Sequence, residues 1–132
     1  LRFTHPKLVS FFTFATVGLS GAGVYLVSLK VTNSLLESTS IAIAVSVWIA
    51  MTWNFLWDRK YAFWYARSRS FIMQYVGFIL VCSVGAIANF YITKSLASSE
   101  TILYSGMIGV VVGSAIGIVF NFLVSRLIVF SK

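Results

Sequence analysis

The chain has 132 residues, of which 59% are hydrophobic and only 10% are charged, and its mean hydropathy is +0.93. Charged residues make up about a quarter of a typical soluble domain, and a soluble fold of this length could not bury so much apolar surface. The composition therefore excludes a soluble globular domain and predicts an integral membrane protein. The net charge of +7 would suit a nucleic-acid binder, but the basic residues flank apolar segments, so we expect no nucleic-acid partner.

Four long apolar segments follow one another along the chain, separated by short polar breaks. They cover residues 8–29, 38–57, 71–93 and 102–124. Each has about the 20 residues that an α-helix needs to cross a bilayer. The stretch at residues 107–120 does not alternate as the strands of a membrane barrel do, and a helix satisfies its own backbone polar groups in lipid. We therefore predict an all-α integral membrane fold of four transmembrane helices, forming a single domain over residues 1–132 of a multi-pass protein of the cell membrane.

The lysine and arginine residues are distributed unequally between the two sides of these predicted helices. Lys30 and Lys94 lie on one side, close to Glu37 and Glu100. Eight basic residues lie on the other side: Arg2, Lys7, Arg59, Lys60, Arg67, Arg69, Arg126 and Lys132. Because basic residues are retained on the cytoplasmic side of membrane proteins, we predict that both termini are cytoplasmic.

A sequence motif occurs twice in the chain. The segment from Asn54 to Phe63 and the segment from Asn121 to Phe130 both read Asn-Phe-Leu-x-x-Arg-x-x-x-Phe, 67 residues apart. The same gap-free shift places Gly18 on Gly85. We predict a duplicated two-helix hairpin, with repeat one at about 7–65 and repeat two at about 74–132. Since each unit spans the membrane twice, the repeats are parallel, and both motifs should face the cytoplasm.

Small residues recur at every fourth position in the second helix of each predicted hairpin. They are Gly109, Gly113 and Gly117 in the fourth helix and Ala42, Ser46 and Ala50 in the second. Such a stripe lets two helix backbones approach closely. We interpret it as helix packing within the bundle or in a homo-oligomer; the alternative is a stripe that lines a lipid path.

Residues for catalysis are scarce. The carboxylates are Glu37, Asp58 and Glu100, and neither His5 nor Cys82 has a partner suited to catalysis or metal binding. We therefore expect a chain without catalytic residues, metal or cofactor.

The repeated asparagine and arginine are the candidate binding residues. Arg59 and Arg126 would lie at headgroup level, with Asn54 and Asn121 deeper. A guanidinium suits phosphate oxygens, so these residues could bind a lipid phosphate. They could equally anchor and connect the helices. Two further arginines, Arg67 and Arg69, could bind anionic lipid or a cytoplasmic partner, or only set the topology.

The two motifs differ in one position that matters for charge. Asp58 in the first motif corresponds to Ser125 in the second. Any site formed by the two motifs is therefore electrostatically asymmetric.

The chain resembles the GtrA-like family along essentially its whole length. The resemblance rests on the four helices, on the segment Phe-Phe-Thr-Phe-Ala-Thr-Val-Gly at residues 11–18, and on the twice-used asparagine–arginine motif. It implies a role with polyprenyl-phosphate-linked sugars, namely assisting their translocation in the synthesis of cell-surface polysaccharide or glycan. The implied phosphate-binding residues are Asn54, Arg59, Asn121 and Arg126, although Asp58 departs from a simple anion site.

Other functions are compatible with the same residues. Similar modules are fused to cytoplasmic glycosyltransferases of the dolichyl-phosphate mannose synthase type, so the chain could be a membrane anchor or oligomerisation domain that translocates nothing. A glycosyltransferase, fused or separate, is then an expected partner, beside membrane lipids and a polyprenyl-phosphate sugar. A small multidrug exporter is a more distant alternative, because residues 8–29 lack the glutamate typical of the first helix of such exporters.

Overall fold

The computed structural model describes the backbone of residues 6–97 and 104–131, and the side chains of residues 7–88, 91 and 114–131. The described residues form helices and contain no strand, which confirms the predicted all-α fold. The long helices are α1 (Pro6–Leu35), α2 (Thr39–Trp57), α3 (Phe71–Ala97) and α4 (Tyr104–Val124). Short helical segments follow α2 and α4: η1 (Asp58–Ala62), η2 (Trp64–Ala66) and η3 (Ser125–Val129).

Three helical segments within the described residues are long and apolar enough to cross a membrane: Lys7–Leu35, Thr39–Ala62 and Phe71–Ala88. The described part of the fourth helix adds a shorter apolar stretch, Ser114–Val129. The helices coincide with the four apolar segments of the sequence, and α1 continues beyond residue 29 to Leu35. Many of their large apolar side chains are exposed, as expected for surfaces that face lipid.

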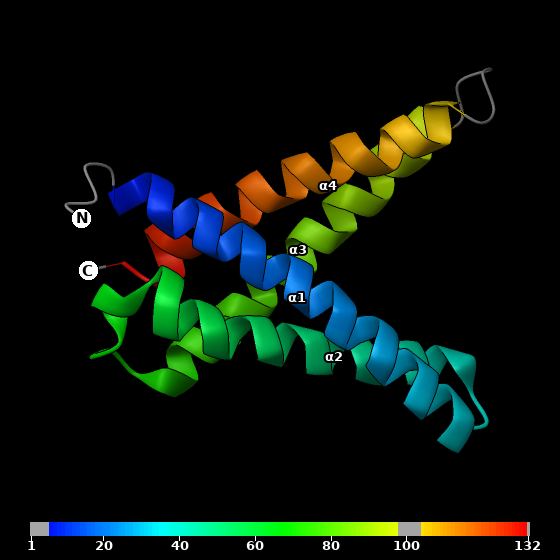
Figure 1. Cartoon of the computed structure of the whole chain (residues 1–132), viewed down its shortest axis with the longest axis horizontal. Helices are drawn as coiled ribbons and strands as arrows, with labels where there is room; N and C mark the ends of the chain where they lie inside the picture. The colour runs from blue at the N-terminus through cyan, green and yellow to red at the C-terminus, as the bar shows by residue number, and fades with distance from the viewer. Residues whose placement is uncertain (1–5, 98–103, 132) are drawn as a thin grey trace. The chain divides into compact units, whose positions relative to one another are not determined.

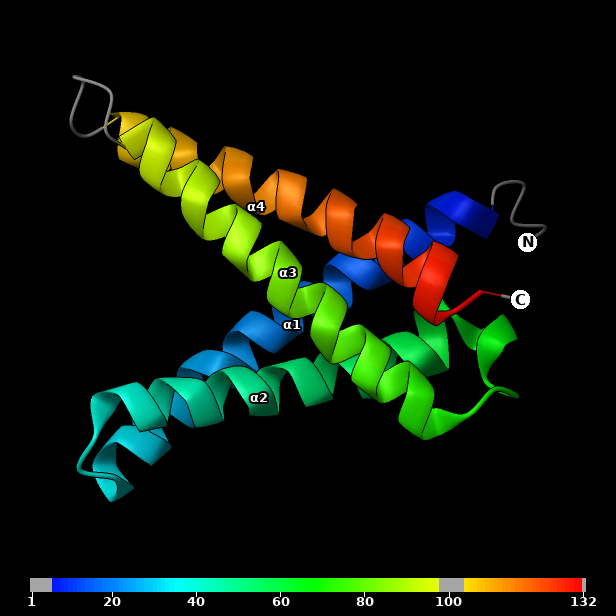
Figure 2. The same cartoon turned by 180° about the vertical axis from the view of Figure 1, so that it is seen from behind.

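The helices form two compact units, one ending at Tyr75 and the other spanning Val76–Ser131. In the first unit, α1 and α2 lie side by side as an antiparallel hairpin, and α3 and α4 form the corresponding hairpin of the second (Figures 1 and 2). The boundary falls inside α3, so its first five residues, 71–75, belong to the first unit.

The small residues of α2 lie in the contact between α1 and α2. Ala42 and Ser46 are fully buried, and Ala50 is nearly so. The Ser46 hydroxyl donates to the Ala42 carbonyl at 2.7 Å and lies 2.9 Å from the Thr32 hydroxyl of α1. This stripe therefore serves helix packing inside the hairpin. In α4, Gly117 is half-buried, whereas Gly109 and Gly113 lie outside the residues whose side chains are described.

Candidate functional site

Each hairpin brings the asparagine of its motif against a glycine of the preceding helix. A Cβ placed on Gly21 would lie 2.7 Å from Cγ of Asn54, and closer still to its Oδ1. A Cβ on Gly85 would likewise lie 2.8 Å from Cγ of Asn121, with Oδ1 again nearer. The carboxamide oxygen thus faces the glycine Cα–H, an arrangement typical of the weak Cα–H···O contacts between helices. Neither Oδ1 has a conventional hydrogen-bond partner.

The glycine contacts show that the two hairpins have different lengths. Asn54 follows Gly21 by 33 positions, and Asn121 follows Gly85 by 36. The structural equivalent of Gly85 is therefore Gly21 and not Gly18, whose own Cβ position is open. The gap-free shift of 67 that pairs Gly18 with Gly85 is wrong for the first helix of each hairpin, where the shift is 64. Close backbone approach decides this register, since only glycine leaves room for the carboxamide.

Two pairs of phenylalanines show the same two sequence shifts, 64 positions in the first helix of each hairpin and 67 positions in the motif. Phe14 of α1 makes an edge contact with Phe63, with ring centroids 6.0 Å apart. In the second unit, Phe78 of α3 meets Phe130 in the same way at 6.2 Å. All four rings are buried. Phe14 and Phe78 are 64 positions apart, as Gly21 and Gly85 are, whereas Phe63 and Phe130 are 67 apart.

A π-helical turn lets the asparagine and the phenylalanine of each motif contact the same neighbouring helix. Nine positions separate Asn54 from Phe63, which is about 2.5 turns of an α-helix, so a regular helix would place them on opposite sides. The π-helices η1 and η3 widen this turn, and the Phe63 N–H donates to the Asp58 carbonyl at 2.8 Å. The Phe130 N–H donates to the Ser125 carbonyl at 2.7 Å. Such π-turns are rare and are often found at functional sites.

Arg59 holds the turn that connects η2 to α3. Its Nε donates to the Gln74 side-chain oxygen at 2.8 Å, and its Nη2 donates to the carbonyls of Arg67 at 2.8 Å and Arg69 at 3.3 Å. The buried Gln74 amide completes the network by donating to the Ala66 carbonyl at 2.8 Å. We call this network of Arg59, Gln74 and the 66–69 carbonyls the Arg59 clamp. Arg59 is therefore a positioning residue for the turn, and only its Nη1 is without a hydrogen bond in the described chain.

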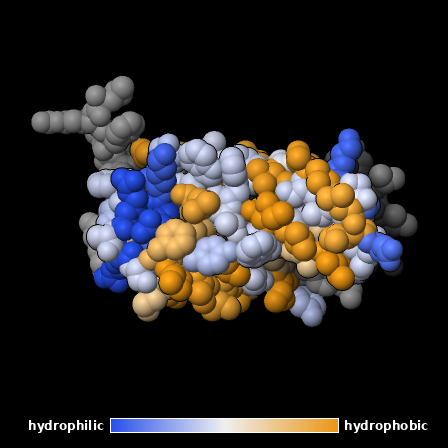
Figure 3. Space-filling model, turned by 90° about the horizontal axis from the view of Figure 1, so that it is seen from below, coloured by the Kyte–Doolittle hydropathy of each residue, from blue (hydrophilic) through white to orange (hydrophobic). Residues whose placement is uncertain are grey.

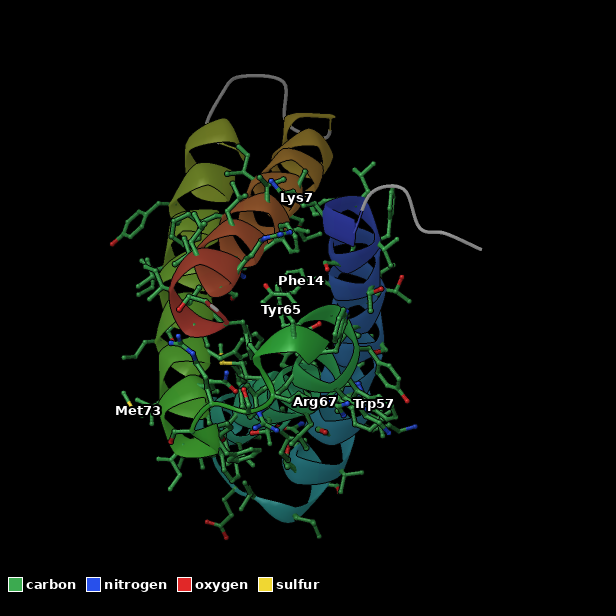
Figure 4. All side chains as sticks on the ribbon, turned by 90° about the vertical axis from the view of Figure 1, so that its left-hand side faces the viewer. Lys7, Phe14, Trp57, Tyr65, Arg67 and Met73 are labelled. Atoms are coloured by element: carbon green, nitrogen blue, oxygen red, sulfur yellow. The ribbon has the colours of Figure 1, made fainter. Side chains whose placement is uncertain are left out.

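The turn held by the clamp presents a basic surface beside a cluster of aromatic rings. Arg67, Arg69 and Lys60 are exposed; Arg67, Trp57 and Tyr65 are labelled in Figure 4. Lys60 Nζ lies 5.0 Å from the ring centroid of Tyr61, which stacks on Trp57. Figure 3 shows hydrophilic residues gathered at the ends of the visible face and apolar residues across its middle. Aromatic and basic side chains at a helix end are typical of a membrane interface.

The other two predicted residues, Asn121 and Arg126, belong to the second unit. Arg126 is half-buried in η3, and Asn121 is half-buried next to Gly85. Each motif belongs to a different unit, so the meeting of the two motifs at one membrane face stays a prediction. Among the residues that the structure describes, no three His, Cys, Asp or Glu side chains are grouped so as to hold a metal ion.

Sequence reasoning missed Gln74 and the glycine partners of the asparagines. Gln74 is 3% exposed and stands 64 positions after Ser10, which is also buried. Gln74 could have been noticed in the sequence, because it is a polar residue inside the third apolar segment. Gly21 and Gly85 had no such signal, because nothing in one sequence tells which of several helical glycines is closely approached.

The apolar helices, together with the Arg59 clamp, define a small multi-pass helical membrane module. A comparison with protein families identifies it further: the family model described as "GtrA/DPMS, transmembrane domain" matches residues 13–130. The chain belongs to this family, which confirms the resemblance inferred from its motifs and its place among multi-pass membrane proteins. It is thereby a membrane module associated with polyprenyl-phosphate sugar processes. A search of curated proteins gave no match.

Proposed function

We propose that the chain handles polyprenyl-phosphate-linked sugars by holding the lipid phosphate at the membrane interface and assisting movement of the sugar across the bilayer. The observation that carries this proposal is the turn held by the Arg59 clamp. It displays Arg67 and Arg69 to solvent at the end of a membrane-spanning helix. The proposed role is non-catalytic binding and passage, with the chemistry of sugar transfer left to a partner glycosyltransferase, fused or separate.

Local charge supports an anionic ligand. The segment from η1 to the start of α3 has four basic residues and one acid, Asp58, which is 1% exposed. The exposed charges of this segment are therefore all positive. Each basic residue near a membrane surface attracts an anionic lipid by about 1 kcal/mol.

The Arg59 clamp also holds the backbone of the turn that carries these positive charges. Backbone carbonyls of Arg67 and Arg69 accept hydrogen bonds from Nη2 of Arg59, so the turn is held while the side chains of both residues remain exposed. A preorganised turn loses less conformational entropy on binding than a free loop. The phosphate would meet Arg67 and Arg69 directly, with Nη1 of Arg59 as a further donor.

A binding assay tests the first half of the proposal. The purified chain in nanodiscs would be titrated with a fluorescent polyprenyl-phosphate sugar. We expect the double variant Arg67→Gln with Arg69→Gln to bind the lipid more weakly, by about fivefold per charge removed. Lys30→Gln is the control and should leave the affinity unchanged, because Lys30 lies near the C-terminal end of α1, on the side of the membrane predicted to be opposite to the clamp. Equal affinity of the double variant and the parent chain would refute the assigned site.

A translocation assay separates the proposal from its alternative, a membrane anchor that presents lipid phosphate to a glycosyltransferase. The family description joins the GtrA and DPMS modules, which is why the anchor is retained. Proteoliposomes would contain the labelled lipid sugar, and a membrane-impermeant quencher would report its transbilayer exchange. Exchange that depends on the chain supports translocation, whereas binding without exchange supports the anchor.

A further inference from the structure

Three aromatic side chains form a row along α2 and η1 in the first unit. The ring centroids of Trp53 and Trp57 are 5.4 Å apart, and those of Trp57 and Tyr61 are also 5.4 Å apart. The rings of Trp57 and Tyr61 are nearly parallel, with 9° between their planes. Residues four positions apart are neighbours on a helix surface, so the three rings follow one side of this helix. We call Trp53, Trp57 and Tyr61 the aromatic row.

The aromatic row lies at the surface of the hairpin. Tyr61 is 50% exposed, Trp53 is 36% exposed and Trp57 is half-buried. Trp53 Nε1 donates to Ser20 Oγ of α1 at 3.0 Å, which ties the row to the neighbouring helix. Neither the indole N–H of Trp57 nor the hydroxyl of Tyr61 forms a hydrogen bond with another described residue. The row therefore combines a defined position with exposed ring surface and two polar groups that a ligand can use.

The second hairpin does not repeat the aromatic row. By the shift of 67 that relates the two motifs, positions 53, 57 and 61 correspond to Phe120, Val124 and Ile128. Ile128 is 70% exposed, so an aliphatic side chain is sufficient where this surface only meets lipid. Interfacial belts place tryptophan and tyrosine at helix ends generally, and a belt would not distinguish two equivalent helix ends. Packing and membrane anchoring therefore do not account for the row.

The charges around the aromatic row limit which ligands it suits. Lys60 Nζ lies 5.6 Å from the ring centroid of Trp57 and 5.0 Å from that of Tyr61. Ring faces attract positive charge, but the exposed Lys60, Arg67 and Arg69 of the same segment would repel a cationic ligand. A suitable ligand has a neutral body that stacks on the rings and an anionic group that meets the basic residues.

A sugar phosphate has both properties. The axial C–H groups of a pyranose carry a slight positive charge, so one face of the sugar packs flat against the negative face of an aromatic ring. Its hydroxyl groups accept and donate hydrogen bonds at the edges of the same ring. Its phosphate is anionic and suits lysine and arginine.

We propose that the aromatic row is the platform on which the sugar of a lipid-linked sugar phosphate stacks, an inference that rests on the function proposed above. The rings of Trp57 and Tyr61 contact the C–H face of the sugar, and their N–H and O–H groups bind its hydroxyls. Tyr61 lies near the end of the spanning segment Thr39–Ala62, and Trp53 lies further inside it. The sugar therefore meets a further ring as it leaves the interface.

A comparison of two lipids tests the proposal. The chain in nanodiscs would be titrated with polyprenyl phosphate esterified by methanol and with polyprenyl phosphate esterified by glucose. Both are phosphodiesters with a single negative charge, so they differ in the sugar alone. We expect the parent chain to bind the glucosyl lipid about two- to tenfold more tightly, as a stacked ring contact would provide. Trp57→Val with Tyr61→Ile, which copies the second hairpin, should bind both lipids with the parent's affinity for the methyl ester.

Two further variants serve as controls. Trp48→Val removes a tryptophan of α2 that is 57% exposed and lies outside the row, and it should keep the parent's preference for the glucosyl lipid. Trp57→Phe with Tyr61→Phe keeps the ring faces and should retain most of that preference, so its loss in this variant would contradict stacking.

The same titrations separate failure of this inference from failure of the proposed function. Equal affinity of the parent chain for the two lipids would overturn the sugar platform, and so would a preference that survives in Trp57→Val with Tyr61→Ile. Affinities for both lipids that do not change in Arg67→Gln with Arg69→Gln would instead contradict the phosphate site of the proposed function.

Discussion

The carboxamide oxygen of Asn54 occupies the space that a Cβ on Gly21 would require. The contact is possible only because Gly21 has no side chain, and it fixes how α1 passes α2. The same relationship joins Asn121 to Gly85 in the second unit. Asn54, which the sequence suggests as a phosphate-binding residue, thus also forms a structural contact between two helices.

Gly21→Ala should destabilise the first hairpin. The added methyl group would overlap the Asn54 carboxamide, and overpacking of this kind costs about 1–3 kcal/mol. Thermal unfolding in detergent measures the loss. Gly18→Ala is the matched control, because its Cβ position is open and alanine favours a helix over glycine by about 0.5–1 kcal/mol. Equal stability of the two variants would contradict the observed register.

Gly85→Ala should destabilise the second hairpin in the same way, and Asn121→Ala should partly relieve it. Shortening the asparagine removes the group that the new methyl meets, so the double variant should be more stable than the sum of the single losses predicts. A double-mutant cycle of unfolding free energies measures this coupling. Strict additivity would show that the two residues do not touch.

Arg59→Lys should loosen the turn that precedes α3. Lysine has no planar fork, so it cannot reproduce the bonds to Gln74 and to the two carbonyls at once. Each lost hydrogen bond contributes about 1 kcal/mol. Faster tryptic cleavage after Arg67 and Arg69 would report the loosening. Lys60→Arg is the control, and cleavage at the parental rate in Arg59→Lys would exclude the clamp.

Ser46→Leu should separate α1 from α2. Ser46 is fully buried and lies 2.9 Å from the Thr32 hydroxyl, so a larger side chain has no room and costs about 1–3 kcal/mol. Ala44→Leu is the control, because Ala44 is exposed on the same helix. Thermal unfolding should distinguish them, and similar melting temperatures would refute tight packing along the stripe.

Cysteine labelling should place the two ends of the first hairpin on opposite sides of the membrane. In a Cys82→Ser background, Ser68→Cys should react with an impermeant reagent only from the cytoplasmic side, and Ser34→Cys only from the other. Arg126→Cys should behave like Ser68→Cys, because the repeats are predicted to be parallel. Labelling of positions 68 and 126 from opposite sides would refute the parallel arrangement.

The four helices and the family were readable from the sequence, and most helix bounds agree within a few residues, although α1 extends six residues beyond its predicted end. Length and apolarity determine a membrane-spanning helix almost alone, since lipid leaves the backbone no other way to satisfy its polar groups. The duplicated motif was equally readable, because identical residues at a fixed shift need no structure to be recognised.

Contacts between helices were not readable in this way. Three features depend on which side chains approach one another in the folded chain. They are the equivalence of Gly21 with Gly85, the π-turns that bring Phe63 and Phe130 to the same helix as the asparagines, and the hydrogen bond between Arg59 and Gln74. In a helix that is apolar on every side, periodicity does not single out the packed face. The sequence by itself determined the spans and their charge asymmetry; only the tertiary structure decided the register, because register follows from close packing between residues far apart in the chain.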